Sequence, residues 1–373
     1  MIAVLETYLI VWRTIALRDR EVIDALVDPS HAGPSPEISA ALEHWPGRYY
    51  WSDEPDGRHL VLTRRAVRPQ PEAWWLHVLL LVATVLCTTY AGAVFRDALP
   101  PSVMTFWTGL VALDREFLGQ LLQGLTFSVP LIGILLAHEL GHYFTARRYL
   151  LDTSPPYFIP VPVFPGLFIG TLGAFIRLRT ILSDRRQLLD VGIAGPIAGF
   201  LVALPALWFG LRESIVLPAG HASEGLIVHL GVTVELGHSL ATLGMQHLAG
   251  LGGEALVLHP VAFAGWFGIF LTMLNLLPIA QLDGGHILYS ALPRLHGRAA
   301  VLFWALLGIL GYFFWVGWGA WALLILLLSR GRLGHPPVLD GHRPLPPSRR
   351  WLVVGAVVLF ALTFSPIPFW VQP

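Results

Sequence analysis

Long apolar runs constrain this chain more than any other feature of its sequence. Of its 373 residues, 55% are hydrophobic and only 13% are charged, whereas an average soluble domain has about 25% charged residues. Several runs reach the roughly 20 residues that an α-helix needs to cross a bilayer. We therefore expect a polytopic α-helical membrane protein with about six to seven transmembrane helices. The runs lie near 73–95, 121–146, 187–211, 259–281 and 351–370, with a further stretch at 299–329.

The stretch 299–329 decides how the chain is oriented in the membrane. As one helix it would be about 45 Å long, more than the hydrocarbon core of about 30 Å, and "VGWG" at 316–319 could divide it into two short helices. With two helices most arginines fall on one side, so the positive-inside rule favours this topology over a single tilted span. The inner side then holds Arg147, Arg148, Arg177, Arg179, Arg185, Arg186, Arg294, Arg298, Arg330, Arg332, Arg343, Arg349 and Arg350, and the outer side holds Arg96, Arg115 and Arg212.

Composition divides the chain into three parts. Residues 1–70 are expected to form a small N-terminal α/β domain on the cytosolic side, residues 71–298 a transmembrane core, and residues 299–373 further transmembrane helices with a proline-rich inner loop. Within the first part, 17–27 is helix-like, and 48–65 is typical of two strands joined by an Asp-Gly turn. The function of this first part is not readable from its sequence.

The N-terminal residues and the overall charge exclude several classes of protein. Glu6 and Arg13 interrupt the first apolar run, so we expect no signal peptide, and the acidic residues Glu6, Asp19 and Glu21 argue against a transit peptide. The formal net charge is zero, and no nucleic-acid-binding motif is present, so no nucleic acid partner is expected. The single cysteine, Cys87, can form no intrachain disulfide and provides no cysteine-based metal site.

The sequence "LLAHELGHYF" at 135–144 places three ionisable side chains inside an apolar run. In an H-E-x-x-H pattern on a helix, His138 and His142 lie one turn apart on the same face. Both imidazoles could then hold one Zn²⁺, with Glu139 beside them to take a proton from a catalytic water. Polar groups at membrane depth are costly and usually line a cavity, so this pattern indicates function.

The segment 154–180 that follows is apolar, but it is too rich in proline to form a regular helix. Non-helical backbone is tolerated at membrane depth where protein or a watery cavity satisfies it, so we expect a re-entrant loop. Its last part, 171–179, alternates as a strand does. Such a strand could pair with an unwound substrate by β-augmentation. The residues predicted to bind substrate are Gly173, Ala174, Phe175 and Ile176.

A catalytic zinc takes three protein ligands, so two histidines leave the site incomplete. The candidate third ligand is in "NLLPIAQLDGGH", which contains Asn275, Asp283 and His286, and where Pro278 should break the helix and leave the following residues free to turn toward a cavity. H-E-x-x-H in one span, followed by N-x-x-P-x-x-x-L-D-G in a later one, resembles the site-2 protease family of intramembrane zinc metalloproteases (peptidase family M50). "VGIAGPIAGF" at 191–200 is similar to the family's glycine-proline stretch, and the resemblance covers about 121–290.

The resemblance implies a residue-by-residue assignment of the site. It places one zinc ion per chain on His138, His142 and Asp283, with Glu139 as general base and Asn275 orienting the substrate or stabilising the tetrahedral intermediate. The substrates it implies are single-span membrane proteins cut within the lipid bilayer. The outer segment 213–258 is too short for a PDZ domain, so the chain is similar to the bacterial and chloroplast branch that lacks one. We expect the inner membrane of a bacterium, with the N-terminus and the active-site side cytoplasmic. The oligomeric state is not readable.

Other residues admit simpler explanations. A second "LDG" contains Asp340, which is more simply a turn residue in a polar, proline-rich loop. His335 and His342 could bind metal, although a solvated loop explains them better, and His286 could act from outside the ligand set. The glycines of "GIAGPIAG" are expected to let the third span approach the two histidines closely. The outer histidines are interpreted as surface or interfacial residues: His221, His229, His238 and His247.

Two other functions compete with the protease of the site-2 type. One is a membrane zinc protease that trims prenylated or misfolded proteins, which typically uses Glu as its third ligand; Asp283 argues against it. The other is a non-catalytic membrane protein that binds metal as a carrier or regulator. Glu139 argues against the second, because zinc binding alone does not require a base.

Overall fold

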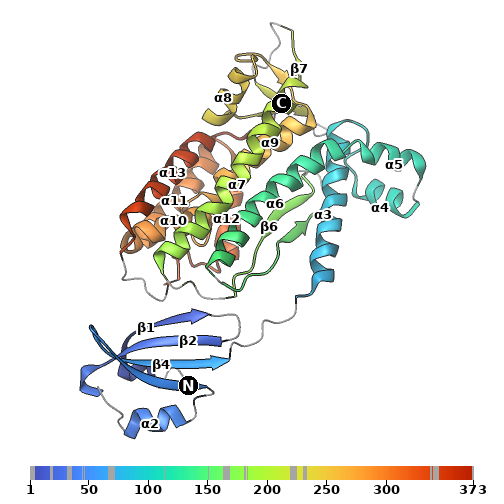
Figure 1. Ribbon diagram of the computed structural model, residues 1–373. Coiled ribbons are helices and arrows are strands. Elements are labelled where there is room, and N and C mark those ends of the chain that lie inside the picture. The colour runs from blue at the N-terminus through green and yellow to red at the C-terminus, as the bar shows by residue number, and fades with distance from the viewer. Residues whose placement is uncertain are drawn as a thin grey trace.

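The computed structural model describes residues 5–16, 20–31, 36–43, 45, 47–65, 72–112, 114–149, 151–162, 169–179, 182, 184–218, 225–229, 233–336, 338 and 344–371. Figure 1 shows a small N-terminal β-domain, drawn in blue, and a larger helical body. Asp340 and His342, in the second "LDG" segment, lie outside the described residues, and so does His221.

The N-terminal domain is a four-stranded antiparallel sheet packed against one helix. The strand order is β1 (Leu9–Ala16), β2 (Arg20–Val27), β4 (Gly57–Arg65), β3 (Arg48–Glu54), and the helix is α2 (Pro36–Glu43). The two expected strands of 48–65 are therefore β3 and β4. Gly57 follows the turn with a φ of 142°, a conformation that residues with a Cβ rarely adopt.

The helix expected over 17–27 is wrong. Arg20–Val27 is strand β2, which pairs with β1 on one edge and with β4 on the other. Its side chains alternate, since Ile23 and Ala25 are buried in the domain core, while Asp24 on the opposite face accepts a hydrogen bond from Arg13 Nε at 2.9 Å. Two flanking strands thus override a local pattern that is compatible with a helix.

Eight helices form the main part of the body in the described residues. They are α3 (Trp74–Phe95), α6 (Leu125–Arg148), α7 (Arg185–Arg212), α9 (Pro260–Asn275), α10 (Asp283–Ala291), α11 (Pro293–Phe313), α12 (Val316–Leu328) and α13 (Pro347–Thr363). Among the described residues, four helices are long and apolar enough to cross a membrane: α3, α6, α7 and α11. The first three match the first three expected spans, whereas α9 and α13 are shorter than expected.

The stretch 299–329 forms two helices rather than one. α11 ends at Phe313 and α12 begins at Val316, so the break lies at the start of the "VGWG" sequence. The two helices then pack against each other. Trp304 Nε1 donates a hydrogen bond to the carbonyl of Ala322 at 2.9 Å, and a Cβ on Gly311 would lie 2.5 Å from the backbone nitrogen of Gly319. Small residues at this crossing allow the two backbones to approach.

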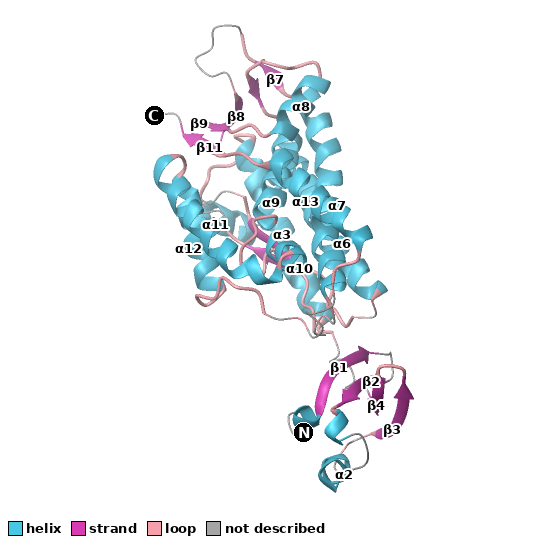
Figure 2. Ribbon diagram, turned by 90° about the vertical axis from the view of Figure 1, so that its left-hand side faces the viewer, coloured by secondary structure: helices cyan, strands magenta, loops and turns pink. Residues whose placement is uncertain are grey.

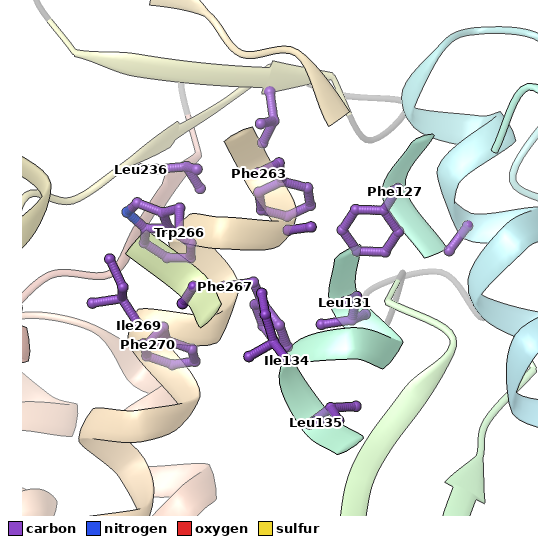
Figure 3. Close-up of a cluster of buried hydrophobic side chains, with 14 of the residues drawn as sticks. Phe127, Leu131, Ile134, Leu135, Leu236, Phe263, Trp266, Phe267, Ile269 and Phe270 are labelled. Carbon is purple, nitrogen blue, oxygen red and sulfur yellow. The ribbon is translucent and has the colours of Figure 1, made fainter. Parts of the chain in front are cut away.

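The core of the body lies where α6, α7 and α9 meet. Figure 3 shows apolar side chains of α6 and α9 facing one another. The rings of Phe127 and Phe263 stack with their centroids 5.4 Å apart, and both side chains are fully buried. This packing fixes the positions of the helices that carry the H-E-x-x-H and N-x-x-P sequences.

The end of the body far from the N-terminal domain has structure that we did not expect from the sequence (Figure 2). A five-stranded sheet has the order β11 (Phe369–Val371), β9 (Thr233–Leu236), β8 (Leu226–His229), β10 (Leu256–Val257), β7 (Ile215–Val216). Three short helices lie at the same end: α4 (Val103–Ala112), α5 (Arg115–Leu122) and α8 (Leu240–Leu248). The strands contain only two to four residues each, too few for a clear alternating pattern.

The proline-rich segment after α6 contains a two-stranded antiparallel sheet, formed by β5 (Tyr157–Pro160) and β6 (Thr171–Phe175). β5 packs against α3, and β6 packs against α6, and Figure 1 shows the pair between these two helices. β6 is shorter than the strand expected over 171–179, although Leu178 continues the pairing through an isolated bridge to Thr153. The hairpin thus lies directly beside the helix that carries the paired histidines.

Candidate metal centre

The two histidines of the H-E-x-x-H sequence point to one spot on the buried face of α6. His138 and His142 are one helical turn apart, and each is 7% exposed. Their Nε2 atoms lie 3.1 Å apart. Two imidazole nitrogens at this separation, with no other base between them, are arranged to share a cation.

Asp283 completes a group of three potential metal ligands. Its carboxylate oxygens lie 3.3 Å from His138 Nε2 and 3.4 Å from His142 Nε2. Two ligands at about 2.1 Å from a tetrahedral ion lie about 3.4 Å apart, so all three separations fit a single zinc-sized ion. Among the described residues, this is the one group of three or more His, Cys, Asp or Glu side chains close enough to hold a metal.

The backbone between α9 and α10 delivers Asp283 to the histidines. α9 ends at Asn275, and Pro278 lies in the non-helical connection that follows. Proline lacks the N–H that a continuing helix would require at this position. Ala280 follows with a φ of 51°, and its N–H donates to the carbonyl of Leu333 at 3.0 Å. α10 then begins at Asp283 itself, so the carboxylate projects from the first residue of a helix.

A hydrogen bond from α6 to α7 fixes the tautomer of one histidine. His142 Nδ1 donates to the carbonyl of Val191 at 2.8 Å. A neutral imidazole with its proton on Nδ1 has a free lone pair on Nε2, which is the atom that faces His138 and Asp283. A carbonyl in this position orients a metal-binding histidine and increases the basicity of its ligand atom.

Glycines on α7 allow this helix to lie directly against the two histidines. A Cβ on Gly195 would overlap the imidazole of His142, and a Cβ on Gly199 would lie 3.2 Å from His138 Nδ1. A glycine on α6 serves the same contact, because a Cβ on Gly141 would lie 2.5 Å from the carbonyl oxygen of Ala194. The close approach expected for "GIAGPIAG" is therefore present, and α7 packs directly against the potential ligands.

Glu139 and Asn275 flank the ligand group. The Glu139 side chain is buried, at 6% exposed, and the backbone N–H of Ile176 faces its carboxylate. Asn275 Nδ2 lies 3.3 Å from His138 Nε2. A carboxylate and an amide are thus placed on the same cavity as the potential ligands, where they could act on groups bound beside a metal.

A cavity of about 220 Å³ opens onto this group. Of the four residues predicted to bind substrate, Ala174, Phe175 and Ile176 line the cavity, whereas Gly173 does not. Gly173 adopts a φ of 105°, and a Cβ there would meet no other atom within 4 Å. The predicted strand residues and the predicted ligands therefore share one cavity.

The strand presents a free backbone edge to this cavity. The carbonyl of Arg177 accepts from the N–H of Ser154, and the N–H of Arg179 donates to the carbonyl of Asp152. Backbone groups of successive residues in a strand point to opposite sides. Those of Ile176 and Leu178 therefore point away from β5, and the N–H of Ile176 faces Glu139. In the described residues, β6 has β5 as its one strand partner.

Sequence reasoning missed two features of the site. The Ile176 N–H that reaches Glu139 comes from backbone geometry, for which no residue type gives a signal. His335 lies in a loop between exposed neighbours, but it is itself half-buried and its Nε2 lies 2.7 Å from His286 Nδ1, a contact that the sequence does not predict. The sequence spacing of 49 residues between these histidines offers no periodicity that could reveal the pair.

Comparisons with known proteins agree with this geometry. The family model described as "Peptidase family M50" matches residues 126–313. The chain is 29% identical over 327 residues to "Probable zinc metalloprotease EGY1, chloroplastic" of Oryza sativa subsp. japonica, covering 83% of this chain and 53% of the relative. It is 28% identical over 372 residues to the Arabidopsis thaliana protein of the same name, covering 94% and 61%.

A third relative is "Probable zinc metalloprotease EGY2, chloroplastic" of Oryza sativa subsp. indica, with 30% identity over 268 residues, 70% of this chain and 45% of the relative. The chain therefore spans about half the length of the curated relatives it matches. No solved structure matches the chain.

Proposed function

The chain belongs to peptidase family M50, and from that membership we propose that it is an intramembrane zinc metalloendopeptidase that cleaves transmembrane segments of membrane proteins. The observation that carries the proposal is the mutual spacing of His138, His142 and Asp283, at 3.1 to 3.4 Å between ligand atoms. When bound there, a zinc ion would polarise a scissile carbonyl and make a water molecule more acidic. The relatives' names, as zinc metalloproteases, support the choice of metal.

Glu139 is the general base in this proposal. Its carboxylate lines the same cavity as the ligands, where it can accept a proton from the attacking water and pass it to the leaving amine. The backbone N–H of Ile176 faces this carboxylate. Asn275, with its amide beside His138, is placed to donate a hydrogen bond to the oxygen on which negative charge develops.

The substrate in this proposal is a single-span membrane protein in a locally unwound form. A helix hides its amides, so the scissile bond must become extended before a water can attack it. The cavity-facing edge offers the carbonyl of Ile176 and both backbone groups of Leu178, with which an extended segment can pair. Such pairing satisfies the substrate's own N–H and C=O groups, which would be costly to leave unpaired in an apolar site. Cleavage of this kind would serve regulated intramembrane proteolysis.

The arrangement in the membrane is also a proposal. We place about six to seven helices across the bilayer, with the β5–β6 hairpin entering it as a re-entrant loop from the inner side. The excess of arginine at that side orients it toward the cytoplasm. The N-terminal domain of residues 1–70 would then be cytosolic, with 71–298 as the protease core and 299–373 as its C-terminal helices. The inner membrane of a bacterium is our proposed location; the relatives named above are chloroplastic.

The competing functions fit the site less well. A membrane protease with Glu as third ligand is disfavoured by the position of Asp283. A carrier or regulator that only holds metal would not need a buried carboxylate beside the ligands, as Glu139 is. The test is zinc content by elemental analysis, together with cleavage of single-span model peptides by the detergent-solubilised protein, with and without a chelator. Zinc at one ion per chain with chelator-sensitive cleavage supports the proposal, and metal without cleavage supports a carrier.

A further inference from the structure

A histidine outside the ligand group faces the same cavity. His286 lies one turn after Asp283 on α10 and lines the cavity together with Glu139 and Ile176. It belongs to none of the ligand contacts, which join His138, His142 and Asp283. Its Nδ1 is engaged by His335, as described above, and the described residues give its Nε2 no hydrogen-bond partner. The cavity therefore contains an imidazole nitrogen that the mechanism above does not use.

His335 is held in place by three separate contacts. Its ring stacks on Tyr289 with centroids 4.5 Å apart and an interplanar angle of 23°. Its backbone N–H donates to His296 Nδ1 at 3.4 Å. Its own Nδ1 lies 2.5 Å from the carbonyl oxygen of Pro336. A residue restrained on its ring face, its backbone and its Nδ1 presents Nε2 to His286 in one defined orientation.

These contacts determine which nitrogen of each ring carries a proton. A carbonyl can only accept, so His335 Nδ1 must donate to Pro336. Burial lowers the pKa of His335 and outweighs the opposing effect of the Pro336 carbonyl, so the ring is neutral near pH 7 and its Nε2 is an acceptor. His286 Nδ1 must then donate to His335 Nε2. The remaining nitrogen of neutral His286, Nε2, is consequently a hydrogen-bond acceptor.

An extended substrate needs such an acceptor on the α10 side of the cavity. If one edge of the substrate pairs with the β6 side at Ile176 and Leu178, its other edge faces α7 and α10. There the cavity is lined largely by apolar residues, which are Leu182, Leu188, Val191, Gly192 and Leu282, together with the exposed Gln281. An N–H on that edge would remain unpaired at a cost of about 1–3 kcal/mol unless an acceptor is present. Asp283 is occupied with the histidine ligands.

We propose that His286 Nε2 accepts a hydrogen bond from one backbone N–H of the bound substrate, and that His335 is the positioning residue that fixes the tautomer required. This inference rests on the proposed function, because it names how that same site holds its substrate. It assigns substrate binding to His286, and it assigns to the loop after α12 the orientation of the His286 ring. Any extended peptide can use the contact, because the group recognised is the backbone and not a side chain.

Binding can be measured apart from turnover. The protein is zinc-loaded Glu139→Gln in detergent, and the probe is a fluorescent single-span model peptide of about 20 apolar residues. A set of versions of this peptide replaces one backbone N–H at a time by an ester oxygen. The variants added to Glu139→Gln are His286→Leu, His286→Gln, His335→Leu and His335→Gln, with His247→Leu on the exposed face of α8 as the matched control. Zinc content and thermal stability are recorded for each.

The expected result is position-specific. His286→Leu weakens peptide binding at least fivefold, about the effect of leaving one buried N–H unpaired, whereas His286→Gln, which keeps an acceptor, stays within about twofold. His335→Leu also weakens binding, His335→Gln restores most of it, and His247→Leu has no effect. One ester position weakens binding to the parent but causes no further loss in His286→Leu.

Two results would overturn the inference. One is unchanged binding by a zinc-loaded His286→Leu protein. The other is an ester series in which no position differs from its neighbours in binding to the Glu139→Gln protein. This result does not depend on the folding of any variant at His286 or His335. Failure of the proposed function would look different, since the wild-type protein would then contain no zinc or would cleave none of the peptides.

Discussion

The backbone N–H of Ile176 faces the carboxylate of Glu139. This contact joins the end of the β5–β6 hairpin to the proposed general base on α6, so the strand that would align a substrate also orients the group that would activate water. The hairpin and the base cannot be perturbed independently at this position. A proline at 176 would remove both the free-edge donor and the Glu139 contact, and a test of the strand must therefore be made elsewhere.

Leu178 is the better position for a test of the strand. Its backbone groups point away from β5, and its side chain lines the cavity. Leu178→Pro removes one free-edge N–H without removing the N–H of Arg179 that donates to Asp152. We expect zinc content close to that of the wild type and cleavage of model peptides reduced at least tenfold, about the effect of one or two lost backbone hydrogen bonds.

Leu178→Val, which keeps the N–H, is the control and should cleave within about threefold of the wild type. Normal cleavage by a zinc-loaded Leu178→Pro protein would mean that the substrate binds away from this edge.

The close packing of α7 on the ligand helix predicts a strong effect of one methyl group. A Cβ at Gly195 would overlap the imidazole of His142, so Gly195→Ala must displace either the ring or α7. We expect zinc content to fall well below one ion per chain, with a loss of about 1–3 kcal/mol in the free energy of unfolding.

Gly133→Ala is the matched change on α6, because a Cβ there would meet no atom within 4 Å. It should leave zinc content unchanged. Equal zinc contents in both variants, measured by elemental analysis, would show that α7 does not restrain His142.

The third ligand can be tested by comparing the two "LDG" sequences. Asp283→Asn replaces a carboxylate placed 3.3 and 3.4 Å from the two histidines by a neutral amide, which is a much poorer ligand for zinc. We expect low zinc content and no cleavage. Asp340→Asn changes the other "LDG" sequence and should retain both, so the reverse pattern would assign the ligand to Asp340.

The orientation of the chain can be tested with single cysteines, because Cys87 is buried and has no counterpart elsewhere in the sequence. On a Cys87→Ala background, Glu254→Cys and Gly334→Cys introduce thiols at exposed positions on either end of the body. A membrane-impermeant maleimide applied to intact cells should label position 254 and should not label position 334 until the cells are opened. Labelling of both positions in intact cells would contradict the proposed topology.

The parts of the fold that depend on local sequence could be predicted, and those that depend on distant partners could not. The helix carrying His138 and His142 follows from a long apolar run, and the break between α9 and α10 follows from Pro278, since both effects operate within a few residues. Strand β2 was mistaken for a helix because its pairing with β1 and β4 is absent from its own eight residues.

The same distinction holds within the site. His138 and His142 can be predicted because they stand in a motif whose residue types and spacing suit metal binding, and Asp283 because its segment resembles that of the site-2 protease family. The contact between His286 and His335, by contrast, joins two segments 49 residues apart. The approach of Ile176 to Glu139 involves a backbone N–H, which every residue except proline carries. Neither contact can be predicted from residue type or sequence spacing.

The most direct test of the account compares wild-type protein with Glu139→Gln, measuring zinc content and peptide cleavage on the same preparations. Glu139 is not among the three ligand residues, so both proteins should contain one zinc ion per chain. Cleavage by the variant should fall by about 10²–10⁴-fold, as expected when a general base is removed. A Glu139→Gln protein that contains zinc and cleaves at the wild-type rate would contradict the account.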